Sequence, residues 1–373
     1  MRLLLSTAGF LLVITCTAVG QQSLNGSTLP DPTRQAFTER KTAEPDTKNP
    51  LAELRTGNEL FKKAEYQSAI QHYQRAVTLD GSFYQAYYNM GVAYVDSRKY
   101  RDAQSAFEKA LALKHDSPAA LKYLGSIHLK LNEVEQATHY FTERLAIDAN
   151  TSEAHSDLGA ALVRLGKYSE AETTFQNALR LEPSSSEALT GLCLTYSAAQ
   201  ENEKAMTACG NAVARTPDAV LPQFLLGKVN LNLGHYEQAL PALQRAVELT
   251  PRDGFVHNSL GVAEFGLGKY QESLKSFQQA MQLEPTSVDG YVGTGSVYLK
   301  LKDYREAKNA FTKAISVQAG SALAHLDLGI TCLEMGQRDC ALEQYNILQT
   351  LDATSAQMLF DKLYGRRVVS VPR

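Results

Sequence analysis

Apolar residues recur along this chain at helical spacing, in stretches that each leave one face to be covered. Within residues 152–185, Leu158 and Leu162 share one face of a predicted helix, and Ala171 and Phe175 share one face of the next. Because each stripe must be buried, the two helices are expected to pack against each other. The pattern therefore predicts a helical hairpin that closes in 34 residues.

The hairpin recurs through residues 50–355 without an inserted or deleted residue, which gives nine consecutive repeats. The same repeat position is glycine in eight of them: Gly57, Gly91, Gly125, Gly159, Gly227, Gly261, Gly295 and Gly329. A glycine inside a helix costs about 1 kcal/mol relative to alanine. We therefore expect two helices to approach closely there, with large side chains such as Phe107 and Phe175 beside the contact.

These positions resemble the tetratricopeptide repeat family, whose repeat also has 34 residues. The second repeat carries the family's pattern as Tyr87, Met90, Gly91, Tyr94, Ala103, Phe107 and Ala110. Single departures from the pattern are Cys193, Ser273, Arg144 and Leu348. The resemblance implies an all-α fold, a right-handed α-solenoid of nine helix-turn-helix repeats with a C-terminal capping helix.

Both ends of the chain differ from the repeats. Residues 1–20 combine one arginine with an apolar run and predict an export signal, and residues 21–49 predict a disordered leader. A membrane anchor fits less well because the run is short, and a lipoprotein anchor at Cys16 fits less well because of the residues before it. We expect a periplasmic or secreted protein without an integral membrane span. Residues 356–373 are expected to form a capping helix and tail, with the helix packed near Tyr345 and Leu348.

Composition and motifs argue against several functions. Removing Arg2 with the signal leaves 36 basic against 40 acidic residues, a balance of −4, so nothing favours nucleic-acid binding. No catalytic or nucleotide-binding motif is present, and we expect neither an enzyme nor a cofactor. His155, His257 and His325 share one repeat position and lie at least two repeats apart, so they predict no metal site. Adjacent opposite charges such as Glu143 and Arg144 are typical of solvated helix faces.

The four cysteines after the signal fall in two repeats. Cys193 and Cys209 lie at matching heights of one predicted hairpin, and Cys332 and Cys340 lie at matching heights of another. Two interpretations stay open, buried thiols that act as small apolar residues and disulfides. The predicted export favours two disulfides.

A partner is expected on the first helices, whose second, fifth, ninth and twelfth positions face the concave groove in this family. In repeats six to eight these positions carry an apolar patch with polar neighbours: Leu221, Phe224, Lys228, Leu231, Phe255, Asn258, Val262, Phe265, Val292 and Leu299. Such a patch is typical of an interaction site, although the same spacing also fits core residues.

The predicted function is therefore a non-catalytic scaffold that holds a partner protein or peptide in this groove. Two alternatives remain. The array could be a structural part of a cell-envelope or secretion assembly that self-associates through its terminal repeats, or an accessory subunit of a separate enzyme.

Overall fold

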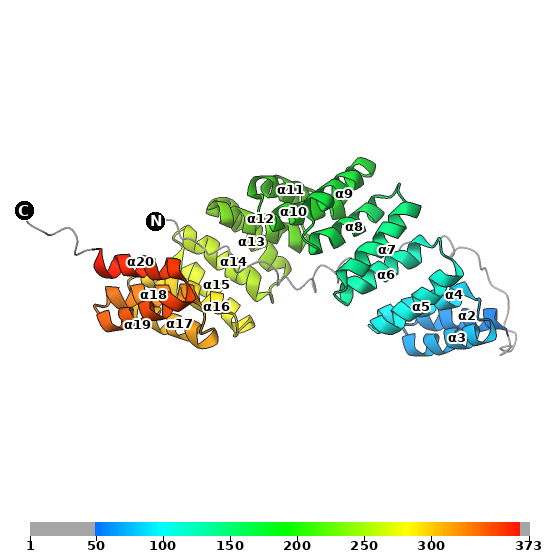
Figure 1. The fold of residues 1–373 in the computed structure, drawn as a ribbon, viewed down its shortest axis with the longest axis horizontal. Coiled ribbons are helices and arrows are strands. Elements are labelled where there is room, and N and C mark those ends of the chain that lie inside the picture. The colour runs from blue at the N-terminus through cyan, green and yellow to red at the C-terminus, as the bar shows by residue number, and fades with distance from the viewer. Residues whose placement is uncertain (1–48, 366–373) are drawn as a thin grey trace, which may run out of the picture. The chain divides into compact units, whose positions relative to one another are not determined.

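The computed structural model describes residues 49–365, which fall into two compact units, 49–201 and 202–365. The predicted signal, nearly all of the predicted leader and residues 366–373 lie outside the described residues. Every regular element within 49–365 is an α-helix. This confirms the predicted all-α solenoid of helical repeats, and we describe its two units separately (Figure 1).

Residues 49–201 form nine helices. In chain order they are α2 (Pro50–Lys62), α3 (Tyr66–Leu79), α4 (Tyr84–Asp96), α5 (Tyr100–Leu113), α6 (Pro118–Lys130), α7 (Val134–Ile147), α8 (Ser152–Arg164), α9 (Tyr168–Leu181) and α10 (Ser186–Ala198).

Residues 202–365 form ten helices. They are α11 (Asn202–Arg215), α12 (Val220–Leu233), α13 (Tyr236–Leu249), α14 (Gly254–Gly266), α15 (Tyr270–Leu283), α16 (Val288–Lys300), α17 (Tyr304–Val317), α18 (Ala322–Glu334), α19 (Arg338–Leu351) and α20 (Ala353–Tyr364).

Each unit is built from hairpins whose two helices pack on each other, such as α4 with α5 and α14 with α15. The second helix of a hairpin also packs on the first helix of the next repeat, as α5 does on α6. Each repeat therefore buries its apolar faces only against its neighbours. We number repeat positions from the first residue of each repeat, so that residue 50 is position 1.

The turn inside each hairpin has one recurring conformation. Position 15 takes a positive φ in all nine repeats, near +73° at Gly166 and near +60° at Arg98. Four repeats place glycine there and five place another residue. Since L side chains are strained in this region, the turn is set by the packing of the two helices and not by glycine alone.

The glycines at position 8 lie against large side chains of the second helix. A Cβ at Gly159 would lie 2.8 Å from the ring of Phe175, and a Cβ at Gly91 would lie 2.8 Å from that of Phe107. The close approach predicted from the sequence is therefore present. Gly329 differs, because a Cβ there would first meet Leu359 of α20, at 2.5 Å.

The helix α20 packs on both α18 and α19 in the way that the first helix of another repeat would. It begins at Ala353, earlier than the start near Ala356 that we expected, because Asp352 caps it by accepting hydrogen bonds from the backbone N–H groups of Thr354 and Ser355. Leu359 is fully buried in the core of the last repeats. Helix α20 thus covers an apolar face that the ninth repeat would otherwise expose.

Candidate functional site

The predicted groove residues of repeats six to eight divide into three groups. Leu231 and Val292 are buried and belong to the core, while Phe255 on α14 is exposed over 44% of its surface. The others are half-buried: Leu221, Phe224, Lys228, Asn258, Val262, Phe265 and Leu299. Spacing alone therefore placed core and surface residues in one set.

The half-buried aromatic residues of this set, Phe224 and Phe265, pack in part against neighbouring side chains. Phe224 and Val262 pack against the buried cluster that includes Leu243. The ring of Phe265 lies 5.9 Å from that of Tyr270, centroid to centroid. Phe255 belongs to none of the buried clusters described for 202–365 and is the side chain of this set most available to a partner.

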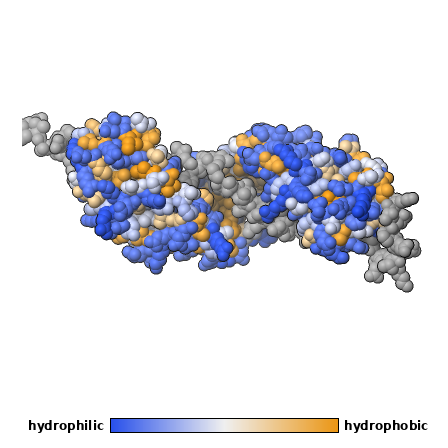
Figure 2. Space-filling view, turned by 90° about the horizontal axis from the view of Figure 1, so that it is seen from below, coloured by the Kyte–Doolittle hydropathy of each residue, from blue (hydrophilic) through white to orange (hydrophobic). Residues whose placement is uncertain are grey.

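Other exposed hydrophobic side chains help to judge Phe255. Five of them occupy position 30, at the end of second helices: Leu79, Leu113, Ile147, Leu181 and Leu351. Because this position recurs along the array, it is a property of the repeat and not of a site. The face in Figure 2 accordingly shows small hydrophobic patches scattered among hydrophilic residues.

Polar groups accompany the apolar ones on the first helices α12, α14 and α16, where the groove is predicted. Burial lowers the pKa of Lys228 on α12, and the charge of Asp289 on α16 opposes this effect. Burial raises the pKa of Asp289, and Lys228 opposes it in turn. On α14, the Oδ1 atom of Asn258 is buried and has no hydrogen-bond partner among the described residues.

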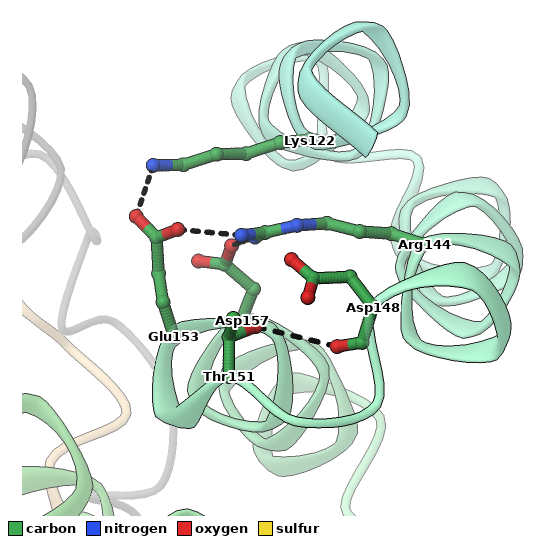
Figure 3. A network of polar contacts seen from close by, with 6 residues as sticks. All are labelled: Lys122, Arg144, Asp148, Thr151, Glu153 and Asp157. Carbon is green, nitrogen blue, oxygen red and sulfur yellow. Dashed lines mark hydrogen bonds and ion pairs between the residues drawn. The ribbon is translucent and has the colours of Figure 1, made fainter. Parts of the chain in front are cut away.

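An ion-pair network in 49–201 contradicts the expectation of a solvated position for Arg144, whereas Glu143 is exposed as expected. Arg144 of α7 is buried, and its guanidinium binds the carboxylates of Glu153 and Asp157 on α8 (Figure 3). Lys122 of α6 pairs with Glu153. Arg144 occupies position 27, which is alanine in seven other repeats, and this departure was the signal in the sequence.

The carboxylates of this network differ in pKa. Burial raises the pKa of Glu153, but Lys122 and Arg144 outweigh it, so the pKa lies below its ordinary value. Burial also raises the pKa of Asp157, to about 6, despite the attraction of Arg144. Removing the arginine would leave Asp157 without its strongest partner, and would leave Glu153 paired with Lys122 alone.

One further carboxylate is poorly solvated. Asp327 on α18 keeps part of its surface exposed, yet burial raises its pKa to about 7. It occupies position 6 of the ninth repeat, as Asp157 does in the fourth. No motif in the sequence marks this aspartate as special.

The cysteines of the ninth repeat form a disulfide in the structure, between Cys332 of α18 and Cys340 of α19, with their Cα atoms 5.9 Å apart. Cys193 and Cys209 are buried and belong to different units. Their predicted pairing stays a prediction.

The three histidines at position 4 each contact the loop that precedes their own repeat. Nε2 of His155 lies 3.1 Å from the carbonyl oxygen of Ala149, and His257 and His325 make the same contact with the carbonyl six residues before them. These contacts fix each histidine to the preceding loop. Within 49–365 no three His, Cys, Asp or Glu residues come together as metal ligands would.

Not one of the helices between residues 49 and 365 is both long and apolar enough to cross a bilayer.

Comparisons with known proteins agree with the repeat period. Models of the tetratricopeptide repeat match residues 57–97, 88–150, 254–287 and 288–320. The model of the cilia and flagella-associated protein 70 middle TPR-like domain matches residues 130–259. No curated protein matches the chain.

Three solved structures are similar to this chain, and the two with TM-scores of 0.50 or more show the same fold. The Cut9–Hcn1 hetero-tetramer of the APC/C is 16% identical, with a TM-score of 0.54 over 93% of this chain and 81% of that one. A tetratricopeptide repeat protein from Parabacteroides merdae is 18% identical, with a TM-score of 0.50 over 66% of this chain and 98% of that one. YrrB, described as a TPR protein with an unusual peptide-binding site, is 27% identical, with a TM-score of 0.44 over 48% of this chain and 91% of that one.

The family models together cover residues 57–320 without a gap, and the helices follow the same 34-residue period. This chain belongs to the tetratricopeptide repeat family, whose repeats generally serve as non-catalytic scaffolds for protein–protein interaction.

Proposed function

We propose that this protein is an exported, non-catalytic scaffold that holds a partner protein or peptide along the first helices α12, α14 and α16. The observation that carries the proposal is the exposure of Phe255, at 44%, on a first helix. Among the described residues, the other large hydrophobic side chain exposed inside a first helix is Leu51 of α2. An aromatic residue in such a place is typical of a binding anchor.

The polar groups around Phe255 fit the same role. Lys228, Asn258 and Asp289 come from three successive first helices, and all three residues are half-buried. A peptide brings both apolar side chains and N–H groups. It therefore matches this surface better than a purely apolar ligand.

The experiment compares Phe255→Ser with Leu351→Ser. Both side chains are similarly exposed, at 44% and 41%, but Leu351 lies at position 30 of a second helix. Proteins from the exported fraction are captured on the full chain and on each variant. We expect Phe255→Ser to lose most of the captured partner, and Leu351→Ser to retain it, with both variants as stable as the parent. Equal capture by the two variants would contradict the proposal.

The structure also decides which residues suit this test. Phe224 and Phe265 pack against neighbouring side chains, so their truncation would lower stability and binding together. The export part of the proposal is tested separately, by sequencing the N-terminus of the protein from the exported fraction. We expect it to begin at Gln21.

A second candidate, the structural subunit that self-associates, is favoured by the exposed side chains of the terminal helix. Met358 and Phe360 of α20 are exposed over 39% and 38% of their surfaces. If they join copies of the chain, sedimentation should show a mass that increases with concentration. Phe360→Ser should then abolish the increase.

A further inference from the structure

The two position-6 aspartates, Asp157 and Asp327, lie five repeats apart, since 5 × 34 = 170 residues separate them. Asp157 pairs with Arg144, which stands at position 27 of the preceding repeat. The residue at that position before Asp327 is Ala314, which is fully buried. The partner of the first aspartate is therefore missing for the second.

The other two residues of the Arg144 network also have apolar counterparts in the eighth and ninth repeats. The residues that correspond to Lys122 and Glu153 are Val292 and Leu323. Both belong to or pack against the apolar core of the last repeats. Within residues 49–365, Asp327 has no ion pair and its carboxylate has no hydrogen bond, while its backbone carbonyl accepts a hydrogen bond from the hydroxyl of Thr331. Its carboxylate thus stands in apolar surroundings without a cation.

Position 6 is oriented toward the preceding hairpin, as other repeats show. The ring of Tyr123 stacks on that of Phe107 with centroids 4.7 Å apart. A Cβ at Gly293 would lie 2.4 Å from the ring of Phe277. By this equivalence Asp327 faces the α17 side, whereas α20 packs on α18 next to Gly329. The partly exposed carboxylate is therefore not the surface that α20 covers.

The eighth and ninth repeats contribute charge of one sign to this face, where Asp289 also interacts with Lys228 of the sixth repeat. At positions 2, 5, 6, 9 and 12 of the eighth and ninth repeats, the residues are Asp289, Val292, Gly293, Ser296, Leu299, Leu323, Leu326, Asp327, Ile330 and Leu333. Two are acidic, none is basic and most are apolar. A ligand with a cation between apolar groups complements this set.

We propose that Asp327 binds an arginine or lysine side chain of a partner peptide, with apolar residues of that peptide on either side of the cation. The bound cation would take the place that Arg144 takes beside Asp157. This inference rests on the proposed scaffold function and names the chemistry of the peptide. Carboxylates recognise guanidinium groups especially well because two parallel hydrogen bonds can form.

The experiment uses the full chain and a fluorescent peptide, acetylated and amidated, with the core Val-Leu-Arg-Val-Leu. A matched peptide carries citrulline in place of arginine, which keeps the shape and removes the charge. We expect the arginine peptide to bind at least about tenfold more tightly, because an unpaired charge in a poorly solvated site loses most when its partner is removed. Equal affinity for the two peptides, or binding of neither at millimolar concentration, would overturn the proposal.

Two variants locate the effect. Asp327→Asn should abolish the preference for arginine, whereas Asp339→Asn, which removes the same charge from an exposed position of the same repeat, should leave it unchanged. Equal losses in the two variants would mean general electrostatic attraction and would overturn the site. Failure here also differs from failure of the scaffold proposal, because the Phe255→Ser test does not depend on arginine.

The chain itself supplies one competitor to exclude. Residues 366–373, Arg-Arg-Val-Val-Ser-Val-Pro-Arg, combine cations with apolar residues. Deleting them should leave the affinity for the arginine peptide within about twofold. A tenfold gain would make this segment the occupant and would overturn the assignment to a partner.

Discussion

Arg144 links the third repeat to the fourth through ion pairs. Its guanidinium is buried between α7 and α8 and holds two carboxylates. Breaking a buried ion pair by removing one partner typically costs about 3–5 kcal/mol, because the remaining charge stays buried without compensation. The stability of the network therefore depends on the arginine more than on any single carboxylate.

We predict that Arg144→Ala lowers the free energy of unfolding of the full chain by about 3 kcal/mol or more at pH 8. The loss should be smaller at pH 5, since Asp157, whose pKa is about 6 even beside the arginine, is then protonated. Urea denaturation at both pH values measures the difference. Arg101→Ala is the control, because Arg101 pairs with Glu133 at an exposed site, where such pairs contribute about 1 kcal/mol or less. Equal losses for the two variants would contradict the burial argument.

Asp327 has the opposite effect on stability. Burial raises its pKa from an ordinary value of 3.8 to about 7. The folded state thus holds a proton that the unfolded state releases between about pH 4 and pH 7, so stability falls as the pH rises through this window. A partner's cation would remove this penalty.

We predict that Asp327→Asn stabilises the free protein at pH 8 by about 1–3 kcal/mol, a value reduced from full linkage because the side chain is partly exposed. At pH 4.5 the variant and the parent should be nearly equal, since the carboxyl is then neutral in the folded state. Denaturant titrations at the two pH values measure this. A variant less stable than the parent at pH 8 would mean that the charge is satisfied within the protein.

At the scale of the helix, glycines serve two distinct purposes. Gly159 lies where α8 meets the ring of Phe175, whereas Gly166 lies in the turn with a φ of +73° and open space around its Cα. Residue 159 must lack a side chain because the ring of Phe175 occupies the space. Residue 166 needs only the ability to adopt a positive φ.

We predict that Gly159→Ala destabilises the protein by more than Gly166→Ala. An added Cβ at residue 159 would lie 2.8 Å from the ring of Phe175, which is itself buried and cannot move freely. At residue 166 the loss should be about 1 kcal/mol, the usual penalty of a left-handed conformation. Thermal unfolding of the two variants tests the order. A larger loss at residue 166 would show that the turn, and not the helix contact, limits this hairpin.

The terminal helix α20 acts as a cap through one buried side chain above all. Leu359 is fully buried and fills the space beside Gly329, where most earlier repeats use a ring from their own second helix. We predict that Leu359→Ala lowers the free energy of unfolding by about 2–4 kcal/mol. Met358→Ala, at a neighbouring exposed position, should change it by less than about 1 kcal/mol, as measured by urea denaturation. Similar effects would mean that α20 contributes little to the core.

At the scale of the whole chain, the sequence predicted the fold because every repeat offers the same environment at the same position. The glycine at position 8 and the ring that it faces recur together, so one hairpin explains the others. The same logic failed where a single repeat departs. Arg144 beside Glu143 has the appearance of a surface pair, and only its place at an alanine position marked it as buried.

The candidate site was harder to predict for a related reason. Burial varies among the predicted groove positions. Leu231 and Phe255 both occupy such positions in the sequence, but Leu231 is buried in the structure and Phe255 is exposed. Asp327 carries no motif at all. Its significance appears only when its surroundings are compared with those of Asp157, and such a comparison needs the burial of each neighbour.

The cysteines connect the structure of the chain to its location. The bond between Cys332 and Cys340 closes a loop with a sequence separation of 8, and in the chain-entropy model a loop of this size contributes about 2–3 kcal/mol. A bond of this kind persists in oxidising compartments and is reduced in the cytosol. The predicted export signal and the Cys332–Cys340 bond therefore favour the same kind of compartment.

We predict that protein from the exported fraction has no alkylatable thiol before reduction and four afterwards, from Cys193, Cys209, Cys332 and Cys340. Reduction should lower the free energy of unfolding by about 2 kcal/mol for each bond. A variant with both Cys332 and Cys340 changed to alanine should be less stable than the parent by a similar amount. The stability of this variant should also depend less on reductant than that of the parent.

Mass spectrometry with alkylation before and after reduction counts the reactive thiols. Four reactive thiols in exported protein would contradict both disulfides, whereas two reactive thiols at Cys193 and Cys209 would leave the Cys332–Cys340 bond and contradict the other pair.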